Sequence, residues 1–427
     1  MFMKLWQKIL IGMVLGVLAG IAFGDSIAFL KPLGDIFISL LKLAAVPLVL
    51  TSIIYGITSL SDMKTLGRIG IKTISLYLIT TCFAISFGLA FAHLIEPGKA
   101  GGVMENITSE NFETPEKPDL GQVFTDIFPS NIFFSLSQGE FLQIIVFAIL
   151  FGIALNMAGG QGRKIIEFNN ALMTAFEKLV QIILNFAPIG VFALIAWVIG
   201  NEGVDVLRKL LEFVITFLVA GLLHVIIVYG FLLIFVAKLN WKKFLQKAFE
   251  VQIFGFSTSS SSATLPITIK TATEMGVTPK TRGLVLPIGA TINMDGTALY
   301  QGICVMFVAQ AWGIDLSFIQ ILMVVLMAVL ASIGTAGVPG IALVTLTMIF
   351  ETVGLPLEGI AIIYSIDRLL DMLRTTINVS GDLVVCTAID RSEGSLDDDI
   401  FDGVKSADTA PTPQKDPNIP DSDNRSQ

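Results

Sequence analysis

The chain has 427 residues, of which 54% are hydrophobic and only 15% are charged. A soluble globular protein does not need so much apolar surface, so the composition predicts an all-α polytopic membrane protein. Residues 392–427 carry nine acidic and three basic residues, which accounts for six of the eight net negative charges. The remainder is close to neutral, which argues against nucleic-acid binding. No Walker sequence, Ser/His/Asp arrangement or HExxH motif is present, so we do not expect an enzyme.

Six apolar segments precede residue 240, and each is a candidate membrane span. They cover residues 8–24, 34–60, 71–95, 141–159, 178–200 and 207–238. In the first segment, Gly12, Gly16 and Gly20 recur every four residues and predict a face that packs closely on another helix. Pro188 and Gly190 predict a kink in the fifth.

Basic residues cluster in four places, and the positive-inside rule puts all four in the cytoplasm together with the N-terminus. The clusters are Lys4 and Lys8, Lys64 to Lys72, Arg163 and Lys164, and Lys238 to Lys247. The three cysteines have no CxxC spacing, and the two histidines lie far apart in apolar segments. Neither a disulfide framework nor a metal cluster is therefore indicated.

Two polar stretches interrupt the apolar pattern after residue 240, namely 257–266 (STSSSSATLP) and 332–340 (SIGTAGVPG). Each is flanked by apolar arms and predicts a re-entrant helical hairpin, because exposed backbone inside a membrane needs a covering of protein or a cavity. A further helix follows each hairpin, and breaks at matching places in two halves are typical of inverted-repeat transporters. The first of these helices, about 281–312, is interrupted at residues 293–297, where free carbonyls and an Asp would suit Na⁺.

The stretch 363–391 predicts a spanning helix with one narrow polar stripe. The stripe consists of Asp367, Asp371, Arg374, Asn378 and Asp382. Each ion near the bilayer centre costs about 2.5–3.5 kcal/mol on insertion scales. Such a helix is therefore expected to face a protein-lined cavity that binds something charged; the alternative is a structural ion-pair seam.

Four segments, SSSSATLP, GATINMDGTALYQG, ASIGTAGVPG and DRLLDMLRTTINVSGD, occur in this order between residues 259 and 382. They resemble the signature segments of the dicarboxylate/amino acid:cation symporters, which include the glutamate transporters. The resemblance extends from the first span to about residue 391. It implies eight transmembrane helices, two re-entrant hairpins, inverted repeats and a homotrimer in the lipid bilayer. It also implies an elevator mechanism, in which a scaffold (about 8–60 and 141–200) holds a moving transport part (about 71–95 and 207–391).

The same resemblance implies a substrate site and three Na⁺ sites. The substrate residues are Ser259, Ser260, Ser261, Thr297, Val338, Pro339, Gly340, Ile341, Ala342, Asp371, Arg374, Thr375 and Asn378. The first Na⁺ set comprises backbone oxygens of Gly289, Asn293 and Asn378 with the Asp382 carboxylate. The second comprises backbone oxygens of Thr291, Ser332, Ile333 and Thr335. The third comprises Tyr77, Thr80, Thr81, the Asn293 side chain and Asp295. Members of the family often carry a further arginine at the position of Ser259 or of Met372, and this chain has neither.

The expected function is Na⁺-coupled symport of L-aspartate or L-glutamate across a prokaryotic plasma membrane. Arg374 should hold the side-chain carboxylate and Asp371 the α-ammonium. A C4-dicarboxylate would leave Asp371 unpaired, so succinate and malate should compete poorly. The alternatives are a carrier of neutral amino acids or C4-dicarboxylates, a proton-coupled variant, and an ion channel. The tail 392–427 is rich in Asp, Pro and Ser and is expected to be disordered and cytoplasmic.

Overall fold

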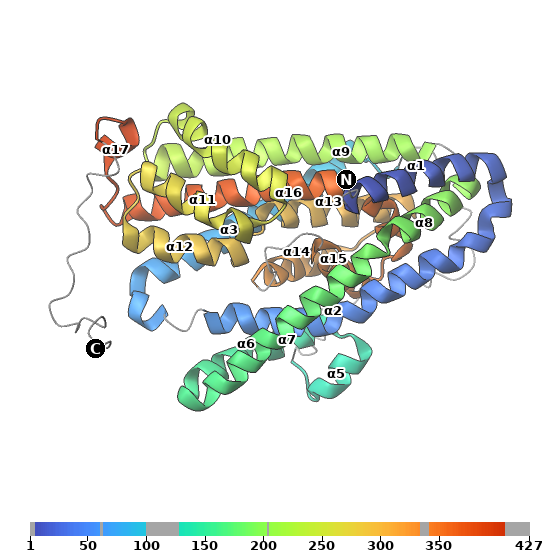
Figure 1. The fold of residues 1–427 in the computed structure, drawn as a ribbon, viewed down its shortest axis with the longest axis horizontal. Coiled ribbons are helices and arrows are strands. Elements are labelled where there is room, and N and C mark those ends of the chain that lie inside the picture. The colour runs from blue at the N-terminus through green and yellow to red at the C-terminus, as the bar shows by residue number, and fades with distance from the viewer. Residues whose placement is uncertain (1–4, 60–62, 100–127, 203–204, 334–340, 406–427) are drawn as a thin grey trace, which may run out of the picture.

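The computed structural model describes residues 5–59, 63–99, 128–202, 205–333 and 341–405, and every regular element in these ranges is helical (Figure 1). Three segments of them are long and apolar enough to span a membrane: Ser26–Thr58, Gly67–Ile95 and Leu207–Val236. A bent pair of helices is a fourth candidate, and four shorter apolar helices accompany them. The all-helical membrane architecture is thus confirmed, whereas the number of eight spans stays a prediction.

One group of helices is built from the N-terminal part of the chain and packs around α2. Its members are α1 (Leu5–Phe23), the 3₁₀ helix Gly24–Leu30, α2 (Lys31–Ser59), α5 (Ile132–Gln138), α6 (Phe141–Met157), α7 (Gly160–Asn185) and α8 (Ala187–Glu202). α2 contacts α6, α7 and α8, and α1 lies along α8 (Figure 1). The expected kink is present, because α7 and α8 are bent by 49° at the break between them. Pro188 lies at the start of α8, where its missing N–H is tolerated.

The glycine face of α1 packs directly on α8. A Cβ on Gly16 would lie 2.8 Å from the Phe192 carbonyl oxygen, and one on Gly20 would lie 2.8 Å from that of Ala196. A Cβ on Gly12 would collide with the Pro188 carbonyl. The close-packing face expected from the four-residue spacing is therefore confirmed, with α8 as the partner.

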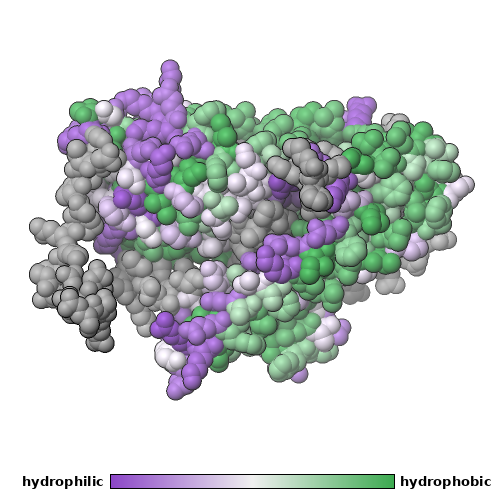
Figure 2. Space-filling view, viewed as in Figure 1, coloured by the Kyte–Doolittle hydropathy of each residue, from purple (hydrophilic) through white to green (hydrophobic). Residues whose placement is uncertain are grey.

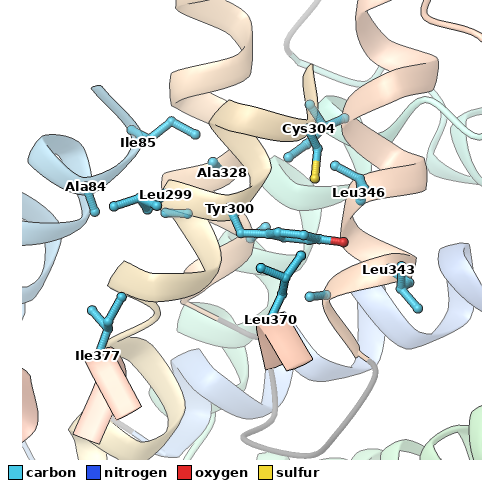
Figure 3. Packing of buried hydrophobic residues seen from close by; sticks show 14 of the residues in the cluster. Ala84, Ile85, Leu299, Tyr300, Cys304, Ala328, Leu343, Leu346, Leu370 and Ile377 are labelled. Carbon is cyan, nitrogen blue, oxygen red and sulfur yellow. The ribbon is translucent and has the colours of Figure 1, made fainter. Parts of the chain in front are cut away.

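The second group is centred on α13 and α16, and α13 is buried along almost its whole length. Its members are α3 (Met63–Ile95), α9 (Asp205–His224) with π-helical turns that follow it, α10 (Trp241–Thr258), α11 (Ser261–Glu274), α12 (Pro279–Ile292), α13 (Asp295–Ala311), α14 (Phe318–Ser332), α15 (Ile341–Val353) and α16 (Glu358–Ser392). α13 contacts α3, α9, α14, α15 and α16. Figure 3 shows Tyr300 of α13 projecting toward Leu343 and Leu346, with Leu370 of α16 beneath its ring.

The first expected hairpin is a pair of packed helices, α10 and α11, that meet at a tight turn. Ser259 adopts a left-handed conformation with φ 53°, and Ser260 caps α11 by accepting a hydrogen bond from the Ala263 N–H at 3.2 Å. Both helices also contact α16. The tip of the second hairpin, residues 334–340, lies outside the described residues, and re-entry into a membrane stays a prediction for both.

The acidic tail is not disordered from its start, which corrects the expectation for residues 393–405. A short helix, α17 (Asp398–Asp402), buries Ile400 and Phe401 to 8% and 2% exposure. The Asp397 N–H donates to the Gly276 carbonyl at 3.1 Å, which ties this helix to the end of α11. The expectation of disorder followed from the average composition of the tail, which does not reflect the local apolar pair Ile400 and Phe401. Residues 406–427 lie outside the described residues.

Glu393 joins the end of α16 to the start of α3. Its carboxylate accepts hydrogen bonds from Arg68 and Lys72, both at 2.6 Å. These two cations lower the pKa of Glu393 to about 2. The carboxylate is thus ionised throughout the neutral range and keeps the end of α16 attached to α3.

Hydrophobic side chains dominate the surface over α1 and α8, whereas hydrophilic side chains gather near α10 and α17 (Figure 2). Leucines point outward from helices of both groups: Leu18 of α1 is 58% exposed and Leu222 of α9 is 61% exposed. Extended apolar surface of this kind matches lipid rather than water.

Replacement of Gly16 by Val should destabilise the α1–α8 contact. The added side chain would force the backbones apart, at a cost of about 1–3 kcal/mol for overpacking. The midpoint of thermal unfolding of the purified protein in detergent should fall. Leu18→Val, on the exposed face of the same helix, is the matched control, and equal midpoints for the two variants would contradict the packing role of Gly16.

Candidate substrate and cation site

The polar stripe of α16 is organised around Arg374, whose side chain is 1% exposed. Its guanidinium donates to Asp367 Oδ1 and to Asp371 Oδ1, both at 2.8 Å. The same group lies over the ring of Tyr300, 4.1 Å from the centroid. A buried guanidinium with two carboxylates and an aromatic face is held in one position. Asp367, Asp371 and Arg374 of the stripe thus form an ordered group of charges, whereas the cavity that the stripe is expected to face stays a prediction.

Asp371 has a second cationic neighbour that the sequence did not indicate. Arg368 Nη1 lies 3.6 Å from Asp371 Oδ2, while Arg374 contacts Oδ1. The Arg368 side chain is 30% exposed, so it is far more accessible than Arg374. The two carboxylate oxygens of Asp371 therefore face two different arginines. We expected Asp371 to lack a cationic partner when the substrate has no ammonium group. That expectation is wrong, because Arg368 and Arg374 both pair with Asp371.

The other expected substrate residues lie on elements that converge on α16. Ser259, Ser260 and Ser261 are buried at the α10–α11 turn. Gln252 of α10 donates to the Ser380 hydroxyl at 3.1 Å, which fixes the hairpin against α16. The remaining residues of this set that the structure describes are also buried: Thr297, Ala342, Asp371, Arg374, Thr375 and Asn378. Val338, Pro339 and Gly340 lie outside the described residues, as does the side chain of Ile341.

The helix break between α12 and α13 places the side chain of Asn293 against Asn378 and Asp382, two other members of the first expected cation set. The Asn293 amide nitrogen donates to the Asn378 carbonyl and to Asp382 Oδ1, both at 2.9 Å. The Gly296 N–H donates to Asn378 Oδ1 at 2.7 Å. Asn378 therefore binds both sides of the break, with its backbone on one side and its side chain on the other.

Asp295 of the third expected set is completely buried, and one other member of the set, Thr81, contacts it. Thr81 of α3 donates to Asp295 Oδ1 at 2.7 Å. Tyr229, which follows α9, donates to Oδ2 at 2.9 Å. His224 Nε2 lies 3.5 Å from the same oxygen. Tyr77 and Thr80 of this set are equally buried.

The oxygen atoms of these two sets fit a small hard cation. A Cβ on Gly289 would collide with both Asp382 Oδ1 and Tyr77 Oη. Only glycine therefore lets these two oxygen atoms lie so close to the backbone of α12. The side-chain oxygen of Asn293 is buried and has no hydrogen-bond partner. Oxygen atoms grouped around a carboxylate are suitable ligands for Na⁺. In the described part of the chain, no group of three His, Cys, Asp or Glu residues forms a site for a metal held by side chains alone.

The second expected cation set cannot be assembled from the described residues, because Thr335 lies outside them. Thr291 is in the last turn of α12, while Ser332 and Ile333 lie at the end of α14. This set stays a prediction.

Three residues near the site were not assigned to it from the sequence: Tyr229, His224 and Tyr300. Tyr229 and His224 lie next to Asp295, and Tyr300 lies next to Arg374. Each contact joins two different helical segments, so no sequence motif or spacing indicates it. The sequence offered one signal for His224, an imidazole in an apolar segment, but its distance from the other histidine argued against a metal cluster and indicated no other partner. Its two ring nitrogens are buried without hydrogen-bond partners.

The family model described as the sodium:dicarboxylate symporter family matches residues 5–392 of the chain. The chain belongs to the sodium:dicarboxylate symporter family. It is 35% identical to a proton/sodium-glutamate symport protein of Bacillus caldotenax, with 92% of this chain and 95% of the relative covered. It is 36% identical to a proton/glutamate-aspartate symporter of Escherichia coli, covering 93% and 94%. A C4-dicarboxylate transport protein of Rhizobium leguminosarum bv. trifolii is 32% identical, covering 93% and 90%.

Membership in this family makes the protein a membrane-embedded transporter of the symporter class. The resemblance deduced from the four sequence segments is confirmed. Relatives named for glutamate, for aspartate and for C4-dicarboxylates all align over nearly the whole chain. The choice among these substrates, and between cations, therefore depends on individual residues rather than on the fold.

Replacement of Gly289 by Ala should abolish cation-dependent substrate uptake. The new methyl group would displace Asp382 and Tyr77 from their positions around the expected cation. Gly283→Ala is the matched control on the same helix, because a Cβ there meets nothing within 4 Å. Uptake by purified protein in liposomes should be lost in the first variant and retained in the second. Retention of normal uptake by Gly289→Ala would exclude a cation at this position.

Proposed function

We propose that the protein is a Na⁺-coupled secondary active symporter of acidic amino acids, L-aspartate or L-glutamate. The observation that carries this proposal is the buried pairing of Arg374 with Asp371, at 2.8 Å on one face of α16. A guanidinium suits a side-chain carboxylate, and a carboxylate suits an α-ammonium. An acidic amino acid is a small ligand that supplies both groups. The names of the Bacillus caldotenax and Escherichia coli relatives support the same substrate class.

Sodium is proposed as the coupling ion because two buried carboxylates, Asp295 and Asp382, lie among oxygen ligands. With the three cation sites expected, one acidic amino acid and three Na⁺ would carry two net positive charges inward. Such a transfer is worth roughly 4.6 kcal/mol at about 100 mV. Proton coupling is the second candidate, since both relatives are named for protons.

For its mode of action we propose an elevator mechanism in a homotrimer, within a prokaryotic plasma membrane and with both termini in the cytoplasm. The grouping of helices supports this proposal, because α2, α6 and α7 contact one another while α3, α10, α12 and α13 gather around α16. The first group would be the scaffold, and the second would carry the substrate.

Replacement of external Na⁺ by choline at pH 7 should abolish concentrative uptake of labelled aspartate into proteoliposomes. The Asp382→Asn variant should require a higher Na⁺ concentration for half-maximal uptake, because one charged ligand is lost. Asp315→Asn, at an exposed carboxylate between α13 and α14, should retain the normal Na⁺ dependence. Undiminished uptake in choline, driven instead by an imposed proton gradient, would favour the proton-coupled alternative.

Replacement of Arg374 by Cys should abolish uptake of aspartate and glutamate and permit uptake of serine or alanine, because the positive charge of the site is lost. Arg208→Cys, at an exposed arginine of α9 whose side chain is 75% exposed, controls for the introduced thiol. A panel of labelled amino acids in the same uptake assay distinguishes the variants. Aspartate transport at normal affinity by the Arg374→Cys protein would refute the assignment.

A further inference from the structure

We propose that Arg368 sets how strongly the transporter discriminates between amino acids and dicarboxylates that lack an amino group. In this proposal Arg368 supplies to Asp371 the positive charge that an amino-acid substrate otherwise brings as its ammonium. The inference rests on the proposed function, because it assumes that Asp371 is the acceptor of that ammonium.

The two arginines next to Asp371 are held very differently. Arg374 is fixed by Asp367 and Asp371 at 2.8 Å and by the face of Tyr300. Arg368 makes a longer ion pair of 3.6 Å with the other oxygen of Asp371, and its side chain is 30% exposed. In a long ion pair whose guanidinium is partly exposed to solvent, that guanidinium is readily exchanged for another cation. Arg368 is therefore placed to give way when an ammonium arrives and to remain when none does.

The charges around Asp371 determine which substrate should bind more weakly when Arg368 is lost. Two carboxylates, Asp367 and Asp371, face two guanidinium groups, Arg368 and Arg374. Without Arg368 the cluster carries one net negative charge, and a dianion such as succinate would bind next to this uncompensated buried charge, which is strongly unfavourable. Aspartate would not, because its ammonium neutralises Asp371. Loss of Arg368 should therefore weaken binding of succinate much more than binding of aspartate.

The position of Arg368 in α16 explains how a second guanidinium reaches the site. Arg368 precedes Asp371 by three residues on α16, so its side chain reaches the same carboxylate from another position. A second guanidinium at the site is thus provided from within the stripe helix itself.

The test compares inhibition of labelled aspartate uptake by unlabelled succinate and by unlabelled aspartate, in proteoliposomes with a Na⁺ gradient. The variants are Arg368→Gln, the charge-preserving Arg368→Lys, and Arg208→Gln, which removes one exposed guanidinium far from Asp371 in the sequence. The measured quantity is the ratio of the two inhibition constants in each protein. Thermal stabilisation of the purified variants by aspartate or succinate gives the same ratio where uptake is too slow.

In the wild-type protein, succinate should inhibit measurably. In Arg368→Gln the ratio of succinate to aspartate inhibition constants should rise on the order of tenfold or more. Arg368→Lys should retain most of the wild-type ratio, and Arg208→Gln all of it. A ratio that is the same in Arg368→Gln and wild type, or a wild-type protein insensitive to a hundredfold excess of succinate over aspartate, would overturn the role of Arg368. Absence of aspartate uptake and binding in the wild type would instead overturn the proposed function.

Discussion

Burial of the Arg374 guanidinium is the constraint on which the rest of the structure depends. An isolated buried charge is prohibitively unfavourable, so it requires hydrogen-bonded partners of opposite charge and a covering of protein. Asp367 and Asp371 provide the partners at 2.8 Å, and Tyr300 of α13 covers one face. Because that covering must come from other helices, α13 is buried on nearly all sides and the α10–α11 hairpin packs on α16.

The breaks in helices are the second consequence of burying charge. Between α12 and α13 the backbone of Asn293 and Met294 leaves the helical conformation. Backbone groups freed at such a break need partners in a setting without water. Asn378 of α16 supplies a side-chain acceptor for the Gly296 N–H at 2.7 Å. The same break presents the carboxylate of Asp295 to Thr81 and Tyr229.

Features that depend on local spacing could be predicted from the sequence. These include the stripe of α16, the glycine face of α1, the kink before Pro188 and a break after α12. The break is shorter than the expected 293–297, because it comprises only Asn293 and Met294 and α13 begins at Asp295. Features that depend on which distant side chain arrives could not: Tyr229 and His224 reach Asp295 from 66 and 71 positions earlier in the chain. The pairing of Asp371 with Arg368 was missed for another reason. Both residues were visible at helical spacing, but Arg368 lies off the narrow stripe, and only the packed structure shows that its side chain turns toward it.

Asn378 gives the proposed coupling of cation and substrate a physical basis. Its carbonyl, which the family resemblance assigns to the first cation set, accepts from the Asn293 side chain, and the same side chain contacts Asp382. Its side chain lies one turn beyond Arg374 on the face expected to hold the substrate. A cation that coordinates the carbonyl oxygen of Asn378 therefore also orients the residue whose side chain is expected to bind the substrate. Such coupling is reciprocal: if the bound cation raises the affinity for the substrate by some factor, the bound substrate raises the affinity for the cation by the same factor.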